Sequence, residues 1–401
     1  MKKLLLLGGS AQQIIAIETA KRLGYSTVLC DYLEDNPGQY YADKFYLIST
    51  TDKDAVLEVA KKEKINGIIA YASDPAAPTA AYVAETLHLP TNPYRSVEIL
   101  CNKDKFREFL LQEGFDVPQA CGYMSADEVV ADIARFHFPI IVKPVDSSGS
   151  KGITVLYEAE KLREAVEFAF SFSRDQRIVV EEFVEKKHKY LIGGDIFVSE
   201  GKVIIWGLLN CHRDNHVNYL VPVGKSFPIS LGDQDIQKVK DTLQSLVEKL
   251  NISFGAMNVE LIIDQNQRVI LLDVGPRNGG NMIPDLLSNI FQVDIVELTV
   301  KAAMGAPVWC EVGEGRAFYA THNLHSDRDG VFDHIEFSEA IERYIIRKNI
   351  YKKKGDKVEY FDNAAKALGI IFFKFESCEE MEDILESIDE YIKICLKDEG
   401  R

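Results

Sequence analysis

The sequence predicts an α/β and α+β protein, with a parallel α/β domain at the N-terminus and mixed α+β segments behind it. Strand and helix patterns alternate through residues 1–92, which is typical of a parallel sheet with right-handed crossovers. Residues 190–229 then read as antiparallel strands around a turn at Glu200-Gly201, and residues 234–250 read as a helix. The change from strict alternation to runs of strands indicates that the two parts have different architectures.

A buried strand at residues 4–7 opens the N-terminal domain, and Gly8-Gly9-Ser10 turns the chain into a helical pattern that Gly24 ends. The turn is not a dinucleotide fingerprint, because Ala, Gln and Gln occupy positions 11–13. We therefore expect a tight α/β turn, with an anion at the helix N-terminus as the lesser alternative. The later elements are expected at 26–30 (strand), 54–62 (helix), 67–71 (strand) and 76–87 (helix).

Pro90-Thr91-Asn92-Pro93 marks the end of this first domain. We place a second domain at 93–306 and a C-terminal α+β segment at 307–401. Expected helices beyond the break lie at 96–113, 160–170, 234–250, 283–290, 293–304 and 379–396. Expected strands lie at 138–143, 153–156, 177–184, 256–263 and 268–274.

Composition excludes several classes of function. The chain has 401 residues and a formal net charge of −16, which disfavours general nucleic-acid binding. Its seven cysteines include no Cys-x-x-Cys pair, so reduced thiols in a cytoplasmic protein fit better than disulfides or structural zinc. The apolar start is too short for a signal peptide, and we expect no membrane span.

Two lysines and a Ser/Gly loop suit the binding of phosphate. Lys103 stands at the start of a helix, and Lys143 closes an apolar strand just before the loop 146–152. A lysine at the end of a buried strand is costly unless it meets an anion. Serine and glycine offer hydroxyls and backbone N–H groups to a polyphosphate without bulky side chains. Each feature alone has a plain alternative, namely solvated charge or a simple connector.

Acidic residues and an arginine follow at suggestive positions. The strand ending Glu181-Glu182-Phe183-Val184 can read adenine by its edge, although surface charge is the alternative. Glu260 and Asp273 lie on neighbouring strands joined by a short turn and can converge on Mg²⁺, which prefers oxygen ligands. Arg277, four residues further on, can meet a transferring phosphoryl group or an anionic substrate. The order and spacing of all these segments favour a joint function.

Taken together, these segments resemble the ATP-grasp superfamily over about residues 1–306, most closely its carboxylate–amine ligases and its carbamoyl-phosphate-synthetase-like branch. The resemblance implies two α+β subdomains that hold ATP between them, the smaller at about 118–184. It implies that Lys103 and Lys143 contact ATP phosphates, and that Arg277, with Lys143, is catalytic at the acyl-phosphate step. It also implies a phosphate loop that includes Ser147, Ser148, Gly149 and Ser150, and an adenine site formed by Glu181, Glu182, Phe183, Val184 and Leu272.

By the same resemblance, Glu260 and Asp273 would hold Mg²⁺. The metal strand departs from the family's Glu-x-Asn-x-Arg ending, because this chain reads Asp273-Val274-Gly275-Pro276-Arg277. A shorter acid and a missing asparagine predict few protein ligands for the metal. At the position of the family's ribose-binding glutamate stands His188, so the ribose contact is left open. For Asp74 a helix cap or turn is expected, and for Arg213 a polar surface turn.

The implied activity is an ATP-dependent ligase that activates a carboxylate as an acyl phosphate and couples it to an amine, with ATP and Mg²⁺ as cofactors. Small-molecule carboxylates and amines are the expected partners, and a homodimer is left open. Two alternatives stay open: activation of bicarbonate or formate, as in carboxylases, and a non-catalytic nucleotide-binding module.

Overall fold

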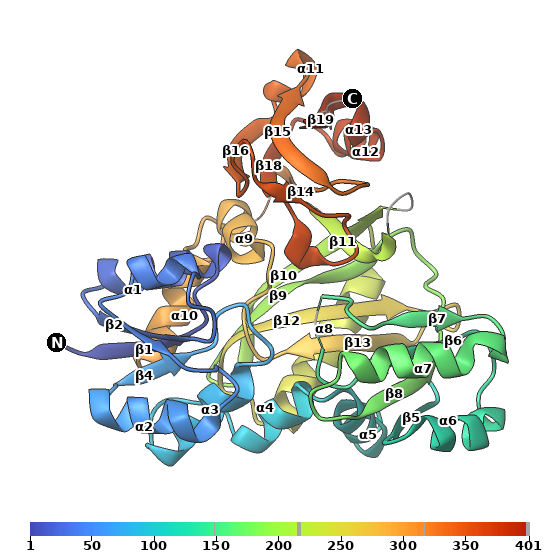
Figure 1. Cartoon of the computed structure of the whole chain (residues 1–401), viewed down its shortest axis with the longest axis horizontal. Helices are drawn as coiled ribbons and strands as arrows, with labels where there is room; N and C mark the ends of the chain where they lie inside the picture. Colours follow the sequence, from blue (N-terminus) through green and yellow to red (C-terminus); the bar gives the residue numbers. More distant parts are fainter. Residues whose placement is uncertain (148, 215–217, 314, 316, 398–401) are drawn as a thin grey trace.

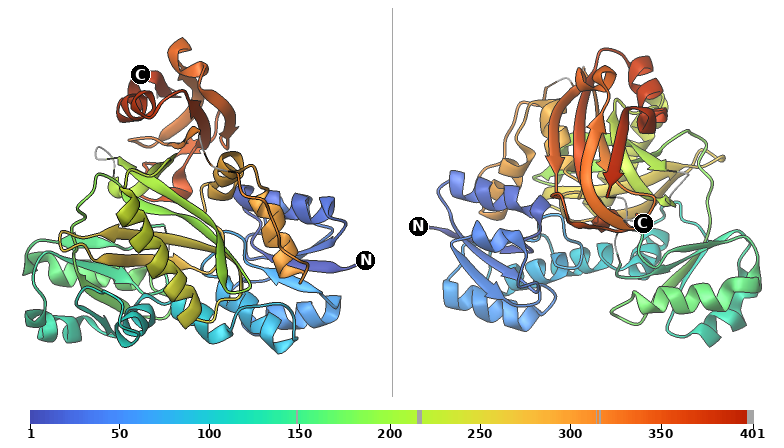
Figure 2. Two further views of the ribbon diagram at one scale, coloured as in Figure 1. Left: turned by 180° about the vertical axis from the view of Figure 1, so that it is seen from behind. Right: turned by 45° about the horizontal axis from the view of Figure 1, so that its top comes forward.

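Four β-sheets organise the chain in the computed structural model, which describes residues 1–147, 149–214, 218–313, 315 and 317–397. A long central sheet occupies the middle of the molecule (Figure 1). The N-terminal α/β unit and a small four-stranded sheet lie on opposite sides of it, and the C-terminal segment rises at one end, as the two further views confirm (Figure 2). This order of a parallel α/β unit followed by α+β parts is the predicted one.

The N-terminal unit is a four-stranded parallel sheet with the order β3-β2-β1-β4. Its centre is the leucine run of β1, which is buried as a parallel strand covered on both faces must be. Sequence reasoning missed β3, a strand of only four residues that is partly or fully exposed. The strands are β1 Lys3–Leu7, β2 Ser26–Asp31, β3 Lys44–Leu47 and β4 Gly67–Ile69; the helices are α1 Ile14–Arg22, α2 Lys53–Glu63 and α3 Ala77–Thr86.

Two helices, rather than the single one expected at 96–113, connect this unit to the rest. They are α4 Tyr94–Leu100 and α5 Lys103–Gln112. The chain breaks at Asn102, which has an extended backbone. The break places Lys103 on the first turn of α5, where its side chain can extend away from the helix.

The small sheet is antiparallel, with the order β5-β8-β6-β7, and α6 and α7 pack on one face of it. The expected strands at 138–143, 153–156 and 177–184 are all present. Its elements are β5 Ala120–Tyr123, α6 Ala126–Asp132, β6 Ile140–Pro144, β7 Thr154–Leu156, α7 Leu162–Ser171 and β8 Ile178–Glu182.

The central sheet has eight strands in the order β13-β12-β9-β10-β11-β14-β18-β16. Its last three strands come from the C-terminal segment, so that segment extends the main sheet rather than standing apart. The strands are β9 Leu191–Ser199, β10 Lys202–Asp214, β11 Asn218–Phe227, β12 Phe254–Ile263, β13 Val269–Gly275, β14 Phe318–Leu324, β16 Ile345–Ile350 and β18 Gly369–Phe375. The helices are α8 Asp233–Lys249, α9 Ile283–Phe291 and α10 Ile295–Ala303.

The acidic helix expected at 379–396 is interrupted at Ser387 and is wrong from Ile392 onward, where the chain forms a strand. Its pieces are α12 Cys378–Glu386, α13 Ile388–Tyr391 and the strand β19 Ile392–Leu396. Ser387 ends α12 with a non-helical backbone, and its hydroxyl donates to the Asp383 carbonyl. β19 then pairs with β15 Gly330–Phe337 in a three-stranded sheet that also contains β17 Lys357–Val358; the short α11 covers Glu339–Glu342.

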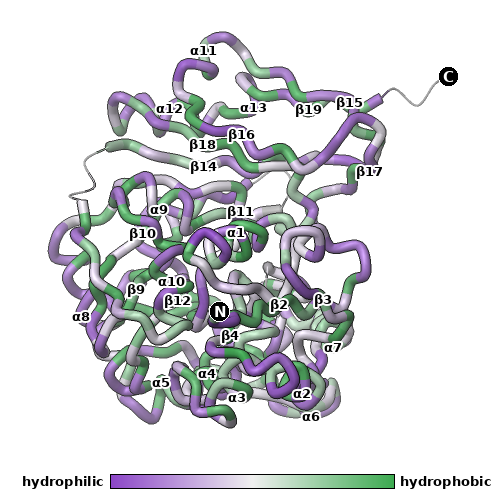
Figure 3. Tube along the Cα trace, turned by 90° about the vertical axis from the view of Figure 1, so that its left-hand side faces the viewer, coloured by the Kyte–Doolittle hydropathy of each residue, from purple (hydrophilic) through white to green (hydrophobic). Residues whose placement is uncertain are grey.

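Hydrophobic and hydrophilic stretches are interspersed along the whole trace (Figure 3). Within the described residues, none of the helices combines the length and apolar character needed to cross a bilayer.

Candidate active site

A cavity of about 900 Å³ lies between the small sheet, the central sheet and the C-terminal segment. It gathers most of the residues that the sequence singled out. The predicted residues that line it are Lys103, Lys143, Ser150, Glu181, Glu182, Phe183, Val184, Glu260, Leu272 and Asp273. Arg277 is not part of this lining, and Ser148 lies outside the described residues.

A buried triad of charges holds the inner wall of the cavity. Glu181 of β8 accepts a hydrogen bond from Lys143 of β6 at 2.9 Å and one from Arg107 of α5 at 3.1 Å. Burial alone raises the pKa of Glu181, but Arg107 and Lys143 outweigh it and lower that pKa to about 2. Burial also lowers the pKa of Lys143, and Glu181 opposes that effect. The Glu181 carboxylate is therefore engaged by two cations, rather than held open for an adenine amino group as expected.

Arg107 is the residue that sequence reasoning missed. Its two Nη atoms donate to the carbonyls of Leu271 and Leu272 on β13, at 2.9 and 2.7 Å. It thus links the small sheet, through Glu181, to β13 of the central sheet. One feature of the sequence could have pointed to Arg107. It lies one helical turn after Lys103, on the face of α5 that meets β8.

Lys103 bridges the Ser/Gly loop 146–152 and the acidic pair Glu260 and Asp273. Its Nζ donates to the Ser147 carbonyl at 2.8 Å and lies 3.5 Å from Asp273 Oδ2. Hydrogen bonds anchor this loop at two residues. Asp146 accepts hydrogen bonds from Arg174, and the Ser150 hydroxyl donates to the Leu220 carbonyl at 2.9 Å. Gly149 between them has a left-handed backbone, φ 69°, and open space around it.

The segment 181–184, at the end of β8, runs from the small sheet towards the central sheet and lines the cavity between them. The amide of Glu182 donates to the Gln119 carbonyl and that of Phe183 to the Pro139 carbonyl, each at 2.9 Å. The Glu182 carboxylate accepts from His137 at 2.8 Å. Its side chain and amide are thus engaged within the small sheet, while its carbonyl belongs to the segment that lines the cavity.

The two acidic residues face each other across β12 and β13, where Glu260 is the register partner of Asp273. Their side chains are 31% and 43% exposed. Burial raises the pKa of Glu260, but Arg213, 3.7 Å away, and then Lys225, Arg277 and Lys103 bring it below its ordinary value. Two carboxylates side by side, open to the cavity and close to Lys103, form a donor set that fits Mg²⁺.

Arg277 points to the N-terminal unit and not to the cavity. Its Nε donates to Asp74 Oδ1 at 2.7 Å and its Nη2 to Asp74 Oδ2, while Nη1 donates to the Asn278 carbonyl. Burial disfavours the charged guanidinium and lowers the pKa of Arg277. Asp74 outweighs this effect and holds that pKa well above its usual range. Asp74 lies in a turn before α3, as one of the two expected roles had it, but its side chain does not cap the helix, because it is the partner of an arginine 203 positions away.

Two further positions take their roles from internal hydrogen bonds. His188 does not face a ribose, because its Nε2 accepts from the Ile263 amide at 2.9 Å and its Nδ1 lies against the Tyr190 carbonyl. At the first glycine turn the Gly9 amide donates to Asp31 at 2.6 Å, and the Ser10 amide donates to Gln13 at 2.9 Å. This internal bonding agrees with the tight turn that we expected.

The cavity continues beyond Glu260 into a part that no motif indicated. Arg213, expected on a polar surface turn, is instead only 19% exposed and lies against Glu260 and the Leu220 carbonyl. Behind it, β14 and the helices α12 and α13 complete the wall. The residues of this part are Tyr190, Cys211, His212, Arg213, Thr321, His322, His325, Leu385, Glu386, Ile388 and Asp389.

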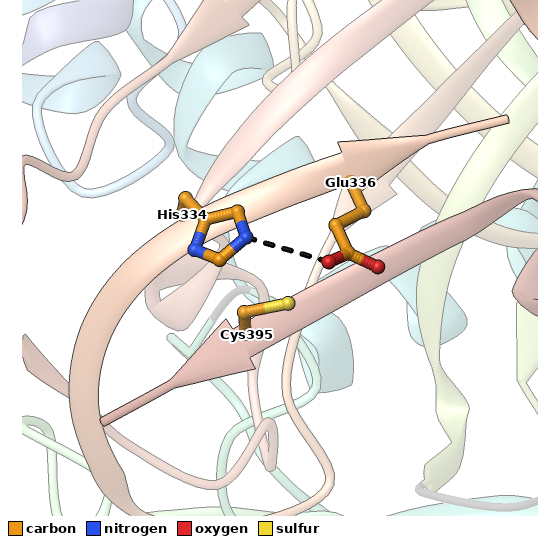
Figure 4. Close-up of side chains that lie close together, drawn as sticks. All are labelled: His334, Glu336 and Cys395. Atoms are coloured by element: carbon orange, nitrogen blue, oxygen red, sulfur yellow. Dashed lines mark ion pairs between the residues drawn. The ribbon is translucent and has the colours of Figure 1, made fainter. Parts of the chain in front are cut away.

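A separate group of possible metal donors lies on the C-terminal ribbon of β15 and β19. His334, Glu336 and Cys395 bring one donor atom each within 4.8 Å of one another (Figure 4). His334 and Glu336 are more than half exposed, and His334 also contacts Asp333. None of the three lines the cavity, and we assign them no part in its chemistry.

Residues 102–309, just over half of the chain, match the family described as the carbamoyl-phosphate synthase L chain, ATP binding domain. The chain is 27% identical over 299 residues to uncharacterized protein y4rH of Sinorhizobium fredii, covering 72% of this chain but only 60% of that protein. It is 28% identical over 324 residues to the formate-dependent phosphoribosylglycinamide formyltransferase of Bacillus velezensis, covering 77% of this chain and 78% of that protein.

Solved structures show the same fold along the whole chain. An L-amino acid ligase from Bacillus licheniformis superposes with a TM-score of 0.83 at 20% identity, covering 99% of each chain. The biotin carboxylase domain of the Hydrogenobacter thermophilus 2-oxoglutarate carboxylase, determined with MgADP, ADP and bicarbonate, superposes with a TM-score of 0.77 at 15% identity. That match covers 99% of this chain and 91% of the other.

Proposed function

Because the chain belongs to the ATP-grasp superfamily, in the family of the carbamoyl-phosphate synthase L chain ATP-binding domain, we propose that it is an ADP-forming carboxylate–amine ligase. It would activate a small carboxylate as an acyl phosphate and pass the acyl group to an amine. The observation that carries this proposal is one cavity of about 900 Å³ lined by Lys103, Lys143, Glu260 and Asp273.

We infer a task for each group that lines the cavity or its edge. The carbonyl of Glu182 and the amide of Val184 would meet the adenine edge, and Leu272 would pack on its face. Lys103 and Lys143 would hold phosphate oxygens, with the loop 146–152 over them. Bound ATP and Mg²⁺ would supply the phosphoryl group and the charge that stabilises its transfer.

The protein's own part is positioning and electrostatics. Glu181 holds the Lys143 ammonium at 2.9 Å, so the cation stands ready at the strand end. Glu260 and Asp273 would hold the metal from one side only, because Gly275 adds no ligand. Arg277 would act from the N-terminal side, in the orientation that Asp74 fixes.

ADP formation with pairs of carboxylates and amines tests the proposal, with Lys143→Met and Glu260→Gln as inactive controls. We expect ADP above the ATP-only background for at least one pair, and none from either variant. Calorimetric titration with ATP accompanies the assay. Tight ATP binding with no turnover for any pair would identify a non-catalytic nucleotide-binding module instead.

A second candidate is activation of formate or bicarbonate, which the similarity to a formate-dependent formyltransferase favours. Formate or bicarbonate supplied with ATP, and with no other carboxylate, separates this candidate from the first. A homodimer and a cytoplasmic location stay predictions; light scattering tests the first and cell fractionation the second.

A further inference from the structure

Outside the cavity, one cluster of side chains combines three different kinds of metal-binding group. His334 and Glu336 lie on β15, and Cys395 lies on the neighbouring strand β19. An imidazole nitrogen, a carboxylate oxygen and a thiol sulfur thus lie within 4.8 Å of one another. Among the described residues, no other group of three or more such donors comes this close together. It is a mixed donor set, unlike the purely acidic clusters that are common on protein surfaces.

Strand pairing places the three side chains on one face of the ribbon. His334 and Glu336 are two positions apart on β15, and His334 is the register partner of Cys395. Residues i and i+2 of a strand share a face, and a register partner lies directly opposite on that face. Figure 4 shows the Cys395 sulfur beside the space between the imidazole and the carboxylate. Regular backbone pairing therefore holds the three donors together.

Asp333 orients the imidazole from its other side. The pairing shifts by one residue between Phe332 and His334, so Asp333 is an extra residue on β15, as in a β-bulge. Its Oδ2 lies 2.7 Å from His334 Nδ1, and Lys354 pairs with its Oδ1 at 2.6 Å. Nδ1 therefore donates to Asp333, while Nε2 faces Glu336 at 3.5 Å. Metal-binding histidines commonly have this arrangement, with a carboxylate on the nitrogen that does not bind the metal.

The chemistry of the donors selects the ion. A thiolate and an imidazole are poor ligands for Mg²⁺ and Ca²⁺, which prefer oxygen. Zn²⁺ accepts sulfur, nitrogen and oxygen together, and three protein ligands leave its fourth tetrahedral position to water. The Glu336 carboxylate is directed to His334, since no ion pair joins it to its register partner Lys393 within the described part of the chain.

We propose that His334, Glu336 and Cys395 form a Zn²⁺ site, with Asp333 fixing the imidazole and a water molecule as the fourth ligand. On binding, the Cys395 thiol gives its proton to solvent, and the thiolate sulfur bonds to the metal. The thiolate and the carboxylate together balance the two charges of the ion. None of these residues lines the cavity, so the inference is independent of the proposed ligase function.

The metal would fasten the last strand that the structure describes. β19 follows α13 directly and pairs with β15, and Ile388 of α13 lines the cavity. A ligand that binds the folded ribbon and not the unfolded chain stabilises the folded form by mass action. We therefore expect Zn²⁺ to slow hydrogen exchange in β15 and β19 and to leave β1 of the N-terminal unit unchanged.

Competition with a chromophoric chelator measures the Zn²⁺ affinity of the full-length, metal-free protein. A non-thiol reductant keeps the cysteines reduced, and excess Mg²⁺ occupies sites made only of oxygen. Asp333→Asn should weaken Zn²⁺ binding about 10- to 100-fold, the usual effect of losing a group that orients a ligand. His334→Asn and Cys395→Ser each remove a ligand and should weaken it further.

Cys378→Ser is the matched control for Cys395→Ser. Cys378 is also partly buried and lies 3.8 Å from the Glu382 carboxylate, but it belongs to no group of three donors in the described chain. This variant should bind Zn²⁺ as the wild type does. Urea unfolding without metal checks that each variant is folded.

Co²⁺ in place of Zn²⁺ identifies the sulfur ligand. A thiolate bound to Co²⁺ gives a strong near-ultraviolet charge-transfer absorption that carboxylates and imidazoles do not give. We expect this absorption in the wild type and in Cys378→Ser, and none in Cys395→Ser. The inference is overturned if the wild type binds Zn²⁺ no more tightly than Cys395→Ser, or if its Co²⁺ form lacks the thiolate absorption. Hydrogen exchange of β19 that is unchanged by Zn²⁺ overturns the fastening role.

Discussion

Arg277 donates two hydrogen bonds to the carboxylate of Asp74 and so joins the loop behind β13 to the loop behind β4, 203 positions earlier. The pair explains why glycine stands where similar proteins have the asparagine of Glu-x-Asn-x-Arg. A Cβ at Gly275 would lie 2.4 Å from Asp74 Oδ1 and 3.2 Å from Arg277 Cζ. A side chain at position 275 would thus force the carboxylate of Asp74, and with it the ion pair, to shift.

The first prediction is that Gly275→Asn lowers the free energy of unfolding by about 1–3 kcal/mol, the usual cost of overpacking, and does not raise turnover. In the Asp74→Ala background the same change should cost much less, because the clashing carboxylate is gone. Urea unfolding of the four proteins of this cycle measures the coupling. Gly232→Asn is the control, since nothing lies within 4 Å of a Cβ at that position; additive effects would disprove the coupling.

The second prediction concerns Arg107. Arg107→Met should lower the free energy of unfolding by about 3–5 kcal/mol, because it leaves the Glu181 carboxylate buried with one partner fewer. Nucleotide affinity should fall as well, since Arg107 also fixes the carbonyls of β13. Arg135→Met, which removes an exposed pair with Asp132, should cost less than about 1 kcal/mol. Equal costs for the two variants would contradict the bridging role.

The third prediction is that the loop 146–152 becomes protected when ATP binds. Its serine and glycine residues pay an entropic cost for ordering, which phosphate contacts can offset. Hydrogen exchange with and without MgATP measures the protection. The turn 264–267 on the far end of β12 serves as the internal reference, and equal exchange of the loop in both states would remove its lid role.

The fourth prediction concerns Mg²⁺. With only Glu260 and Asp273 as protein ligands, the metal should bind weakly to the free protein and well only with ATP present. Glu260→Gln and Asp273→Asn should each reduce turnover by about 100-fold or more, while binding of ATP without metal survives. Glu248→Gln removes an exposed carboxylate on α8 and should change neither quantity. Near-normal turnover in both acidic variants would place the metal elsewhere.

The fifth prediction is a loss of stability below pH 6.5. Burial is the main cause that lowers the pKa of His212 to about 4 and that of His322 to about 3. The folded protein therefore binds fewer protons than the unfolded chain, whose histidines titrate near 6.5, and folding is disfavoured as the pH falls from 6.5 towards 4. Carboxylates such as Glu181 act in a lower window, below about 4.5.

Chemical unfolding at a series of pH values checks this sign. His212→Asn should flatten the fall in unfolding free energy between pH 6.5 and 4, whatever its cost at neutral pH. His334→Asn should leave that fall in place, because the pKa of this exposed histidine is raised, by Asp333 first. A wild-type curve that rises as the pH falls through this window would contradict the prediction.

Local pattern predicted much of the fold, and it singled out residues that line one cavity. The leucine run of β1 and the short turn between β12 and β13 carry their information within a few residues, so both were predicted correctly. Lys103, Lys143, Glu260 and Asp273 meet in one cavity because each stands at the end or edge of an element whose type the sequence indicated. β3 was missed because its four residues are too few, and too exposed, to show a burial pattern.

Long-range pairing could not be predicted in this way. Asp74 and Arg277 are each ordinary loop residues until the fold brings them together. The same holds for Arg107. Its bridging role depends on hydrogen bonds to a carboxylate on β8 and to two carbonyls on β13. His322 reaches the cavity only because β14 pairs with β11, a contact between segments about a hundred positions apart.

That pairing has a consequence for any shortened form of the protein. β14 covers the outer backbone of β11 from Gly224 to Phe227. Removing the chain beyond about residue 306 would turn β11 into an open sheet edge, with N–H and C=O groups ready to pair with another molecule. Residues 1–306 are therefore not a self-sufficient unit, and a form truncated there should self-associate through that edge.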